Sequence, residues 1–111
     1  MDINFRNNKL LKCANQERYA QKELGMDRAK KFLKRLLELQ AASCLEDVRQ
    51  LPQAKFHPLV GDRLGQISCA LDHPYRLILT PNHNPLPRLE DGGLDWNQIT
   101  AVTIQEIVDY H

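Results

Sequence analysis

The 111-residue sequence has only short apolar runs, and none is long enough to cross a membrane. Residues 1–12 lack the apolar segment of a secretory signal, so we expect a cytoplasmic protein with no membrane partner. The three cysteines are odd in number and far apart in the sequence. This pattern fits reduced thiols and argues against a disulfide framework.

Common motifs of enzymes and metal proteins are also missing. The sequence has no glycine-rich phosphate loop and no G-x-S-x-G turn. Cys69, His73 and His83 do not make a convincing zinc set, so we expect no metal and no other cofactor. Without internal repeats or low-complexity tracts, residues 1–111 fit a single domain with one hydrophobic core.

The charge is unevenly distributed, although the formal net charge is only +1. Residues 1–55 contain 12 Lys and Arg against 7 Asp and Glu, a charge of +5. Residues 56–111 contain 3 against 7, a charge of −4. The basic first half indicates either a partner bound on one face or helices with solvated lysines, and the pattern leaves both open.

The first half of the chain has the periodicity of helices. Helix formers fill residues 8–24, and Gly25 is a natural stop. A second helix is expected over 27–42, where apolar residues recur at helical spacing. Ser43 stands three residues before Glu46, which predicts a capping box and one short helical turn. The predicted buried stripe of the second helix comprises Ala29, Phe32, Leu33, Leu36, Leu37 and Gln40, and Arg28, Lys30, Lys31, Lys34 and Arg35 cover the rest.

Alternation with a period of two predicts strands in the second half. Residues 65–71 and 74–80 alternate and are joined by a tight Asp72-His73-Pro74 turn, which indicates a hairpin. Residues 2–5 alternate as well and predict a short strand. Helices followed by strands indicate an α+β fold, with two N-terminal helices packed on a small antiparallel β-sheet.

The last predicted strand covers residues 100–110. Unbroken alternation would place Val102, Ile104 and Val108 on one face and Asp109 on the other. The connection before it, residues 81–98, is unusually long and contains three prolines and two glycines, which argue against a hidden helix. Loops of this length are usually functional or mobile.

Three positions before the last strand are candidates for chemistry. His57 precedes Pro58, so its backbone is biased to extended geometry, and an isolated loop histidine is often plain surface. Arg63 either binds an anion or pairs with its neighbour Asp62. Arg76 lies in a predicted strand between apolar residues, where a cation needs a partner. That partner is either an anion or a carboxylate of the last strand, Glu106 or Asp109.

The last three residues of the sequence combine an acid, a phenol and an imidazole. In an extended strand, Asp109 and His111 would point the same way, about 6.6 Å apart, with Tyr110 opposite. Such groups move protons or hold phosphates.

Three separated stretches of the sequence form a further pattern. They are Leu51-Pro52 with H-P-L-x-G-D-R at 57–63, an arginine in the following hairpin at Arg76, and the final D-Y-H. In this order they resemble the HigB-type toxins of the RelE/ParE toxin–antitoxin superfamily. The resemblance covers residues 43–80 and 99–111, while the first helices match in type and length only. Val60 stands where many relatives have lysine, and the connection at 81–98 is longer than the usual turn.

The resemblance implies a RelE-like fold and a ribosome-dependent mRNA endonuclease that needs no metal and inhibits translation. It implies that His57 and His111 are acid–base or phosphate-orienting groups, that Arg76 stabilises the transition state, and that Asp109 and Tyr110 orient them. A helix-turn-helix antitoxin, the ribosome and mRNA would be the partners.

Residues outside this set are expected to contact RNA phosphates, namely Arg63, Lys30 and Lys34. Two other functions remain open at this point. One is a non-catalytic binder on the same scaffold, such as the ParE branch that inhibits DNA gyrase. The other is a decayed toxin that only binds its antitoxin.

Overall fold

The computed structural model describes residues 1–109. Within them, four α-helices and a five-stranded mixed sheet form an α+β fold, which confirms the predicted class. The helices are α1 (Asn8–Asn15), α2 (Glu17–Leu24), α3 (Met26–Ala41) and α4 (Leu45–Arg49). The strands are β1 (Asp2–Phe5), β2 (His57–Pro58), β3 (Ile67–Ala70), β4 (Tyr75–Pro81) and β5 (Ala101–Asp109), and two 3₁₀ turns are η1 (Gly61–Arg63) and η2 (Trp96–Gln98).

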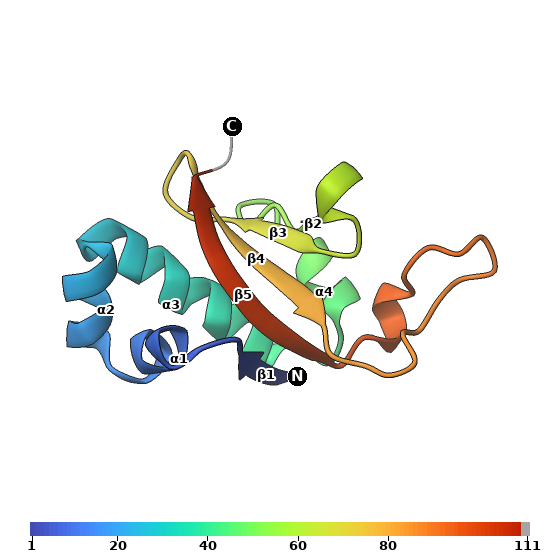
Figure 1. The fold of residues 1–111 in the computed structure, drawn as a ribbon, viewed down its shortest axis with the longest axis horizontal. Helices are drawn as coiled ribbons and strands as arrows, with labels where there is room; N and C mark the ends of the chain where they lie inside the picture. The colour runs from blue at the N-terminus through green and yellow to red at the C-terminus, as the bar shows by residue number, and fades with distance from the viewer. Residues whose placement is uncertain (110–111) are drawn as a thin grey trace.

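The strand order is β1-β5-β4-β3-β2, and the hairpin between β3 and β4 forms as predicted. The prediction of an antiparallel sheet is wrong at one edge, because β1 pairs with β5 in parallel, from Asp2 opposite Ala101 to Phe5 opposite Ile104. Parallel neighbours need a long crossover connection. Here the helices and the other three strands lie between the two paired segments in sequence (Figure 1).

The helical half of the chain contains a break that periodicity did not predict. The expected helix over 8–24 is two helices, because Gln16 is extended (φ −132°) between α1 and α2. The Asn7 side chain caps α1 by accepting from the N–H of Leu10 at 2.9 Å. Gly25, at φ +88°, ends α2 and leads directly into α3, a backbone conformation that glycine adopts without strain. The helix expected over 27–42 is confirmed by α3.

The short helix α4 is capped one residue later than predicted. Its N-cap is Cys44, and the Asp47 carboxylate accepts from the backbone N–H groups of Ser43 (2.9 Å) and Cys44 (3.4 Å). The predicted Ser43–Glu46 box is therefore wrong. Glu46 instead accepts from Arg49 at 3.4 Å, one turn along the same helix.

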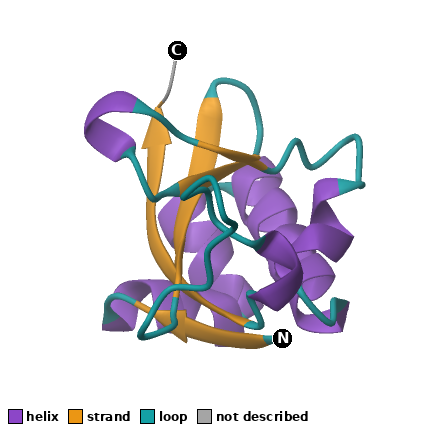
Figure 2. Ribbon diagram, turned by 90° about the vertical axis from the view of Figure 1, so that its right-hand side faces the viewer, coloured by secondary structure: helices purple, strands orange, loops and turns teal. Residues whose placement is uncertain are grey.

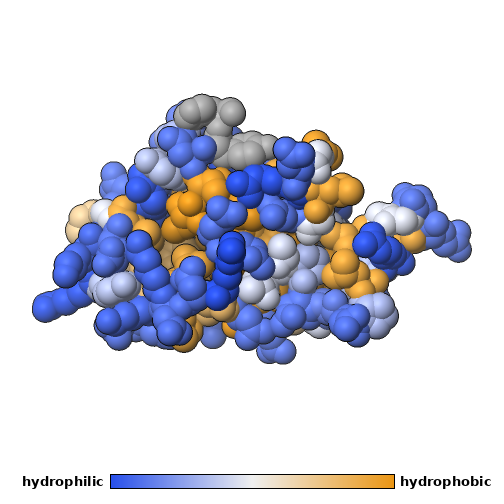
Figure 3. All heavy atoms as spheres, viewed as in Figure 1, coloured by the Kyte–Doolittle hydropathy of each residue, from blue (hydrophilic) through white to orange (hydrophobic). Residues whose placement is uncertain are grey.

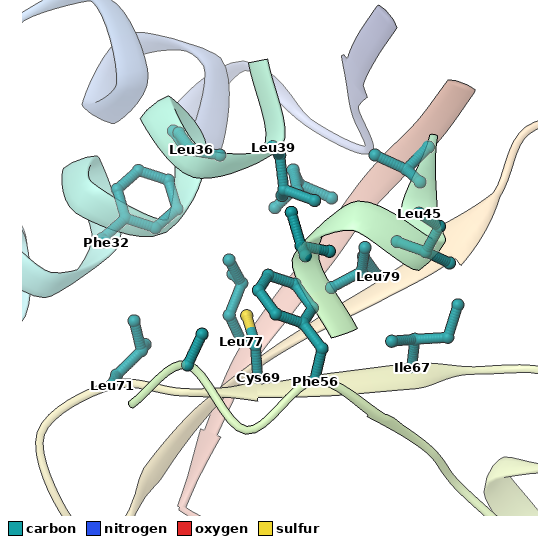
Figure 4. Close-up of a cluster of buried hydrophobic side chains, with 14 of the residues drawn as sticks. Phe32, Leu36, Leu39, Leu45, Phe56, Ile67, Cys69, Leu71, Leu77 and Leu79 are labelled. Atoms are coloured by element: carbon teal, nitrogen blue, oxygen red, sulfur yellow. The ribbon is translucent and has the colours of Figure 1, made fainter. Parts of the chain in front are cut away.

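The core lies between the helices and one face of the sheet. Figure 2 shows the strands as a layer beside the helices, and Figure 4 shows side chains from α3 pointing toward side chains from the strands. Cys69, Leu77 and Leu79 from the sheet and Phe32 and Leu39 from α3 are all fully buried. Removing a buried phenylalanine ring typically costs about 3–5 kcal/mol, so contacts of this kind hold the two layers together.

The strand β5 has one more residue than β4 along their common length. Ile78 pairs with Glu106 and Leu79 pairs with Ile104, so Gln105 has no opposite residue. The strand curves visibly along its length in Figure 1, and a bulge bends a strand in this way. The bulge also reverses the alternation that follows it.

The reversal changes which residues share a face. Leu77 pairs with Ile107 and Tyr75 with Asp109, so Ile107 packs against the core and Asp109 lies on the same face. Val108 pairs with Arg76, on the opposite face. The prediction that Val108 shares a face with the buried residues of β5 is therefore wrong.

The long connection between β4 and β5 extends away from the sheet (Figure 1). It contains no α-helix, as predicted, but it has structure of its own, with a bridge between Arg88 and Leu94 and the turn η2. Trp96 of η2 is only 4% exposed. At the base, Nε2 of His83 accepts from the backbone N–H groups of Thr100 (3.0 Å) and Ala101 (3.3 Å), which ties the loop to the start of β5.

Candidate functional site

The sheet face opposite the core, called the outer face below, carries a row of residues from four strands. His57 pairs with Ser68, Ser68 with Ile78, and Ile78 with Glu106. Residues directly opposite on antiparallel strands project to the same side, so these four side chains share the outer face. Ser68 and Ile78 are fully buried in the middle of the row. Ile78 does not belong to the core cluster, which places it on the other side of the sheet.

Arg76 lies on the outer face beside this row. By register it is opposite Ala70 on one side and Val108 on the other. Its guanidinium group is 3.5 Å from the Ser68 hydroxyl, a long hydrogen bond. Within residues 1–109, Arg76 forms no ion pair. The alternative interpretation, a salt bridge to the last strand, is not found there.

His57 is exposed and lies on the other side of Ser68 from Arg76 in the sheet register. Its Nδ1 is 3.1 Å from the carbonyl oxygen of Pro58. A carbonyl oxygen only accepts, so Nδ1 is the donor in this contact. The structure therefore places His57 and Arg76 on the same face of the sheet, on β2 and β4, with Ser68 of β3 between them.

Arg63 also contacts the outer face. From η1 it donates to the Gln66 side chain at 2.9 Å and to the Glu106 carboxylate at 3.3 Å, rather than to Asp62. The Arg63–Glu106 pair is partly exposed, so it contributes little stability, but it ties η1 to β5 at the end of the row. Glu106 is thereby engaged by Arg63.

Asp109 is not on the face of Arg76. Its register partner is Tyr75, which packs against the core, and the bulge at Gln105 places Asp109 on that same side of the sheet. Tyr110 and His111, the other two predicted site residues of the C-terminal motif, lie outside the described residues.

Lys30 and Lys34 lie apart from His57 and Arg76. Both are exposed on α3, whose buried residues pack on the core side of the sheet. They line a groove of about 640 Å³ between α2 and α3, beside the exposed apolar side chains of Met26 and Leu37. The structure therefore separates these predicted phosphate ligands from the outer face.

The hairpin that carries Arg76 is held to α3 by another arginine. Arg28 donates to both carboxylate oxygens of Asp72, at 3.1 and 3.2 Å, and its guanidinium group lies 3.4 Å from the ring centroid of Tyr75. Two parallel donors to one carboxylate fix orientation as well as distance. These contacts position Tyr75, the residue before Arg76, and pair the Asp72 carboxylate with Arg28.

Two parts of the surface were not predicted from the sequence. One is an apolar groove of about 620 Å³ between residues 58–66 and the long loop, where Leu64 is exposed and Trp96 lies below. Figure 3 shows hydrophobic residues between the sheet and the long loop. The other is a small hollow bordered by Lys55, His73 and Arg76. The position of the single tryptophan in the long connection was a sequence signal for the groove. No sequence pattern indicated the hollow.

The cysteine of the central strands is not a nucleophile candidate. Burial raises the pKa of the Cys69 thiol far above its ordinary value, so the thiolate does not form at neutral pH. Among residues 1–109, no three His, Cys, Asp or Glu side chains are arranged to hold a metal ion. No helix of this part of the chain has the length and hydropathy that crossing a membrane requires.

Neither a scan against protein-family models nor a search of curated proteins found a significant similarity to this chain. The fold and the site therefore define the protein at a coarse level, as an α+β protein. On its outer face, a half-buried arginine and an exposed histidine flank a buried serine.

Proposed function

We propose that the protein is the toxin of a toxin–antitoxin module and acts in the cytoplasm as a metal-independent, ribosome-dependent mRNA endonuclease. The three sequence motifs that resemble HigB-type toxins suggest this function. The observation that carries it is the placement of His57 and Arg76 on either side of Ser68 on the outer face. The finer RelE-like assignment of the fold is part of the same proposal.

The proposed reaction uses the RNA's own 2′-hydroxyl as nucleophile. We assign His57 as the base, which accepts the proton of the 2′-OH while the 2′-oxygen attacks the adjacent phosphorus. Arg76 donates to the phosphorane oxygens as negative charge develops on them. The bond to the 5′-oxygen then breaks, and an acid protonates that oxygen. The products are a 2′,3′-cyclic phosphate and a 5′-hydroxyl end. The resemblance implies an acid–base or phosphate-orienting role for both histidines, and with His57 taken as the base, His111 is the group proposed as the acid.

Arg76 forms no ion pair with any residue from 1 to 109, and this supports its role. A half-buried guanidinium group without a carboxylate partner among residues 1–109 keeps its charge available for a phosphate. Glu106, the carboxylate of the row, accepts from Arg63 instead.

The proposed protein partner is a helix-turn-helix antitoxin. We assign a partly apolar segment of that antitoxin to the groove between α2 and α3, because Met26 and Leu37 are exposed there. Glu17 and Asp27 line the groove together with Lys30 and Lys34, so the apolar side chains rather than a net charge favour this placement. Co-expression with the adjacent reading frame should yield a complex that survives moderate salt. Recovery of the toxin alone would contradict this assignment.

The catalytic proposal is tested by mapping mRNA 5′ ends in a translating extract. His57→Ala, Arg76→Ala and His111→Ala should each lower cleavage by about 10²–10⁴-fold, as expected for loss of an acid–base or transition-state group. Arg18→Ala, which removes an exposed cation on α2, is the matched control and should cleave like the parent. Melting temperatures near that of the parent would show that the loss is catalytic. Parental cleavage by the His57 and Arg76 variants would refute the proposal.

A second candidate function is a non-catalytic binder on this scaffold. The observation that favours it is the bulge at Gln105, which places Asp109 on the opposite side of the sheet from Arg76. Under this alternative, expression arrests growth without new mRNA 5′ ends, and the purified protein inhibits gyrase supercoiling. A chain that does neither but still binds the antitoxin is a decayed toxin.

A further inference from the structure

A hollow lies where β3 and β4 meet at their turn, next to Arg76. It has a volume of about 160 Å³, and its border includes Lys55, His73, Tyr75 and Arg76. A water molecule occupies about 30 Å³ in the liquid, so the hollow has room for a phosphate group and some of its water. Lys55 and His73 are exposed, so an anion can reach both from solvent.

The border of the hollow is basic. Three of its residues carry nitrogen groups that can donate to an anion, and none of its lining residues is a carboxylate. Neither Lys55 nor His73 makes an ion pair or a side-chain hydrogen bond with residues 1–109. The nearest acid in sequence, Asp72, is held by two hydrogen bonds from Arg28. Positive charges gathered without a counter-charge raise the local potential and attract anions.

The backbone of Lys55 is a second and independent observation. Its φ of +51° is the only positive φ of a non-glycine residue among residues 1–109. The neighbouring residues Ala54 and Phe56 are both buried, and the carbonyl of Ala54 accepts from the N–H of Ala70 at 2.7 Å. The surrounding structure therefore holds Lys55 in an unfavourable conformation and keeps it at the border of the hollow. Strain of this kind is found at binding sites more often than elsewhere.

Arg76 connects the hollow to the proposed catalytic residues. It borders the hollow and also donates to Ser68, whose other neighbour in the row is His57. An RNA strand that places one phosphate between His57 and Arg76 therefore brings an adjacent phosphate close to the hollow.

We propose that Lys55 and His73, together with Arg76, bind a backbone phosphodiester of single-stranded RNA adjacent to the phosphate that is cleaved. This inference rests on the proposed function for the identity of the anion. Neither Lys55 nor His73 is assigned a catalytic step. They anchor the strand and thereby set which phosphate reaches His57 and Arg76.

The test measures binding of a 2′-O-methylated trinucleotide, which has two phosphodiesters and cannot be cleaved by its own 2′-oxygen. In the parent protein, titration followed by NMR should give saturable shifts at the backbone amides of Lys55, His73 and Arg76. The double variant Lys55→Asn/His73→Gln should bind about tenfold more weakly. Its plot of log affinity against log salt should be shallower by about 0.7 for each phosphate that the protein no longer neutralises.

The substitutions are chosen so that the double variant folds. Asparagine at position 55 tolerates the left-handed backbone, and glutamine at the exposed position 73 keeps a polar side chain without the imidazole. Lys31→Gln, which removes an exposed cation from α3, is the matched control and should bind the trinucleotide like the parent.

Two results overturn the subsite. One is the absence of saturable shifts at these amides, and the other is equal binding by the double variant and the parent. Cleavage assays on the same proteins separate this outcome from failure of the proposed function. Equal trinucleotide binding by the double variant and the parent, in proteins that both cleave mRNA, refutes the subsite and leaves the nuclease intact. Binding that depends on Lys55 and His73 in a protein that never cleaves mRNA supports the subsite and refutes the nuclease.

Discussion

Replacing Arg35 with methionine should lower the free energy of unfolding by about 3 kcal/mol. Arg35 is only 1% exposed, and it is the largest fully buried side chain in the described part of the chain. Its Nε donates to the carbonyl of Ala70 at 2.8 Å, one terminal nitrogen to Glu38 at 2.8 Å and the other to the carbonyl of Gln53 at 3.2 Å. A single side chain thus joins α3 to β3 and to the segment before β2.

The magnitude follows from what methionine leaves behind. The methionine side chain fills much of the volume of Arg35, so the substitution leaves only a small cavity. The carbonyls of Ala70 and Gln53, however, lose a charged donor. Removing one partner of a buried charged pair typically costs about 3–5 kcal/mol. The low end applies here because Glu38 retains 20% side-chain exposure and can be rehydrated.

Urea unfolding followed by circular dichroism measures the change. With an m-value of about 1.5 kcal/mol/M, typical for a protein of this size, the midpoint should fall by about 2 M. Lys31→Met is the matched control, because it removes an exposed cation from the same helix and should change the free energy of unfolding by less than about 0.5 kcal/mol. An Arg35→Met midpoint equal to that of the parent would refute the reasoning, since the three hydrogen bonds would then contribute no net stability.

Two further predictions concern the long loop and the buried thiol. His83→Ala should remove the acceptor for two backbone N–H groups and speed proteolysis within residues 84–98 severalfold, with a global stability loss of only about 1 kcal/mol, and unchanged proteolysis would contradict it. Burial raises the pKa of the Cys69 thiol above its ordinary value of 9.0. The contribution of this thiol to the free energy of unfolding is therefore fully present below pH 9 and is lost as the pH rises further, because only the thiol of the unfolded chain then ionises. Urea midpoints from pH 8 to 10.5 should therefore fall more steeply for the parent than for Cys69→Ala, and parallel curves would refute this.

The sequence by itself determined the elements whose signals are local. The helical periodicity over 27–42 corresponds to α3, and the Asp72-His73-Pro74 turn between two alternating segments corresponds to the β3–β4 hairpin. These signals are reliable because spacing along the chain fixes which side chains share a face of a helix or strand. The same reasoning marked His57 and Arg76, because a cation or an imidazole stands out within an apolar segment.

The predicted stripe of α3 shows where local reasoning stops. It placed Leu37 inside and Arg35 outside, whereas Leu37 is 65% exposed and Arg35 is buried. The acceptors that make burial of Arg35 possible are the carbonyls of Gln53 and Ala70, which are distant in sequence. The periodicity of apolar residues contains no information on where a charged group finds buried hydrogen-bond partners.

Only the tertiary structure decided which candidate residues meet. The extra residue at Gln105 can be recognised only against the register of β4, and it moves Asp109 to the face opposite Arg76. The pairing of Arg63 with Glu106 depends in the same way on how η1 folds over β5. Sequence spacing therefore identified the chemical groups, whereas strand register and long-range hydrogen bonds determined their positions, because those contacts join segments that are far apart along the chain.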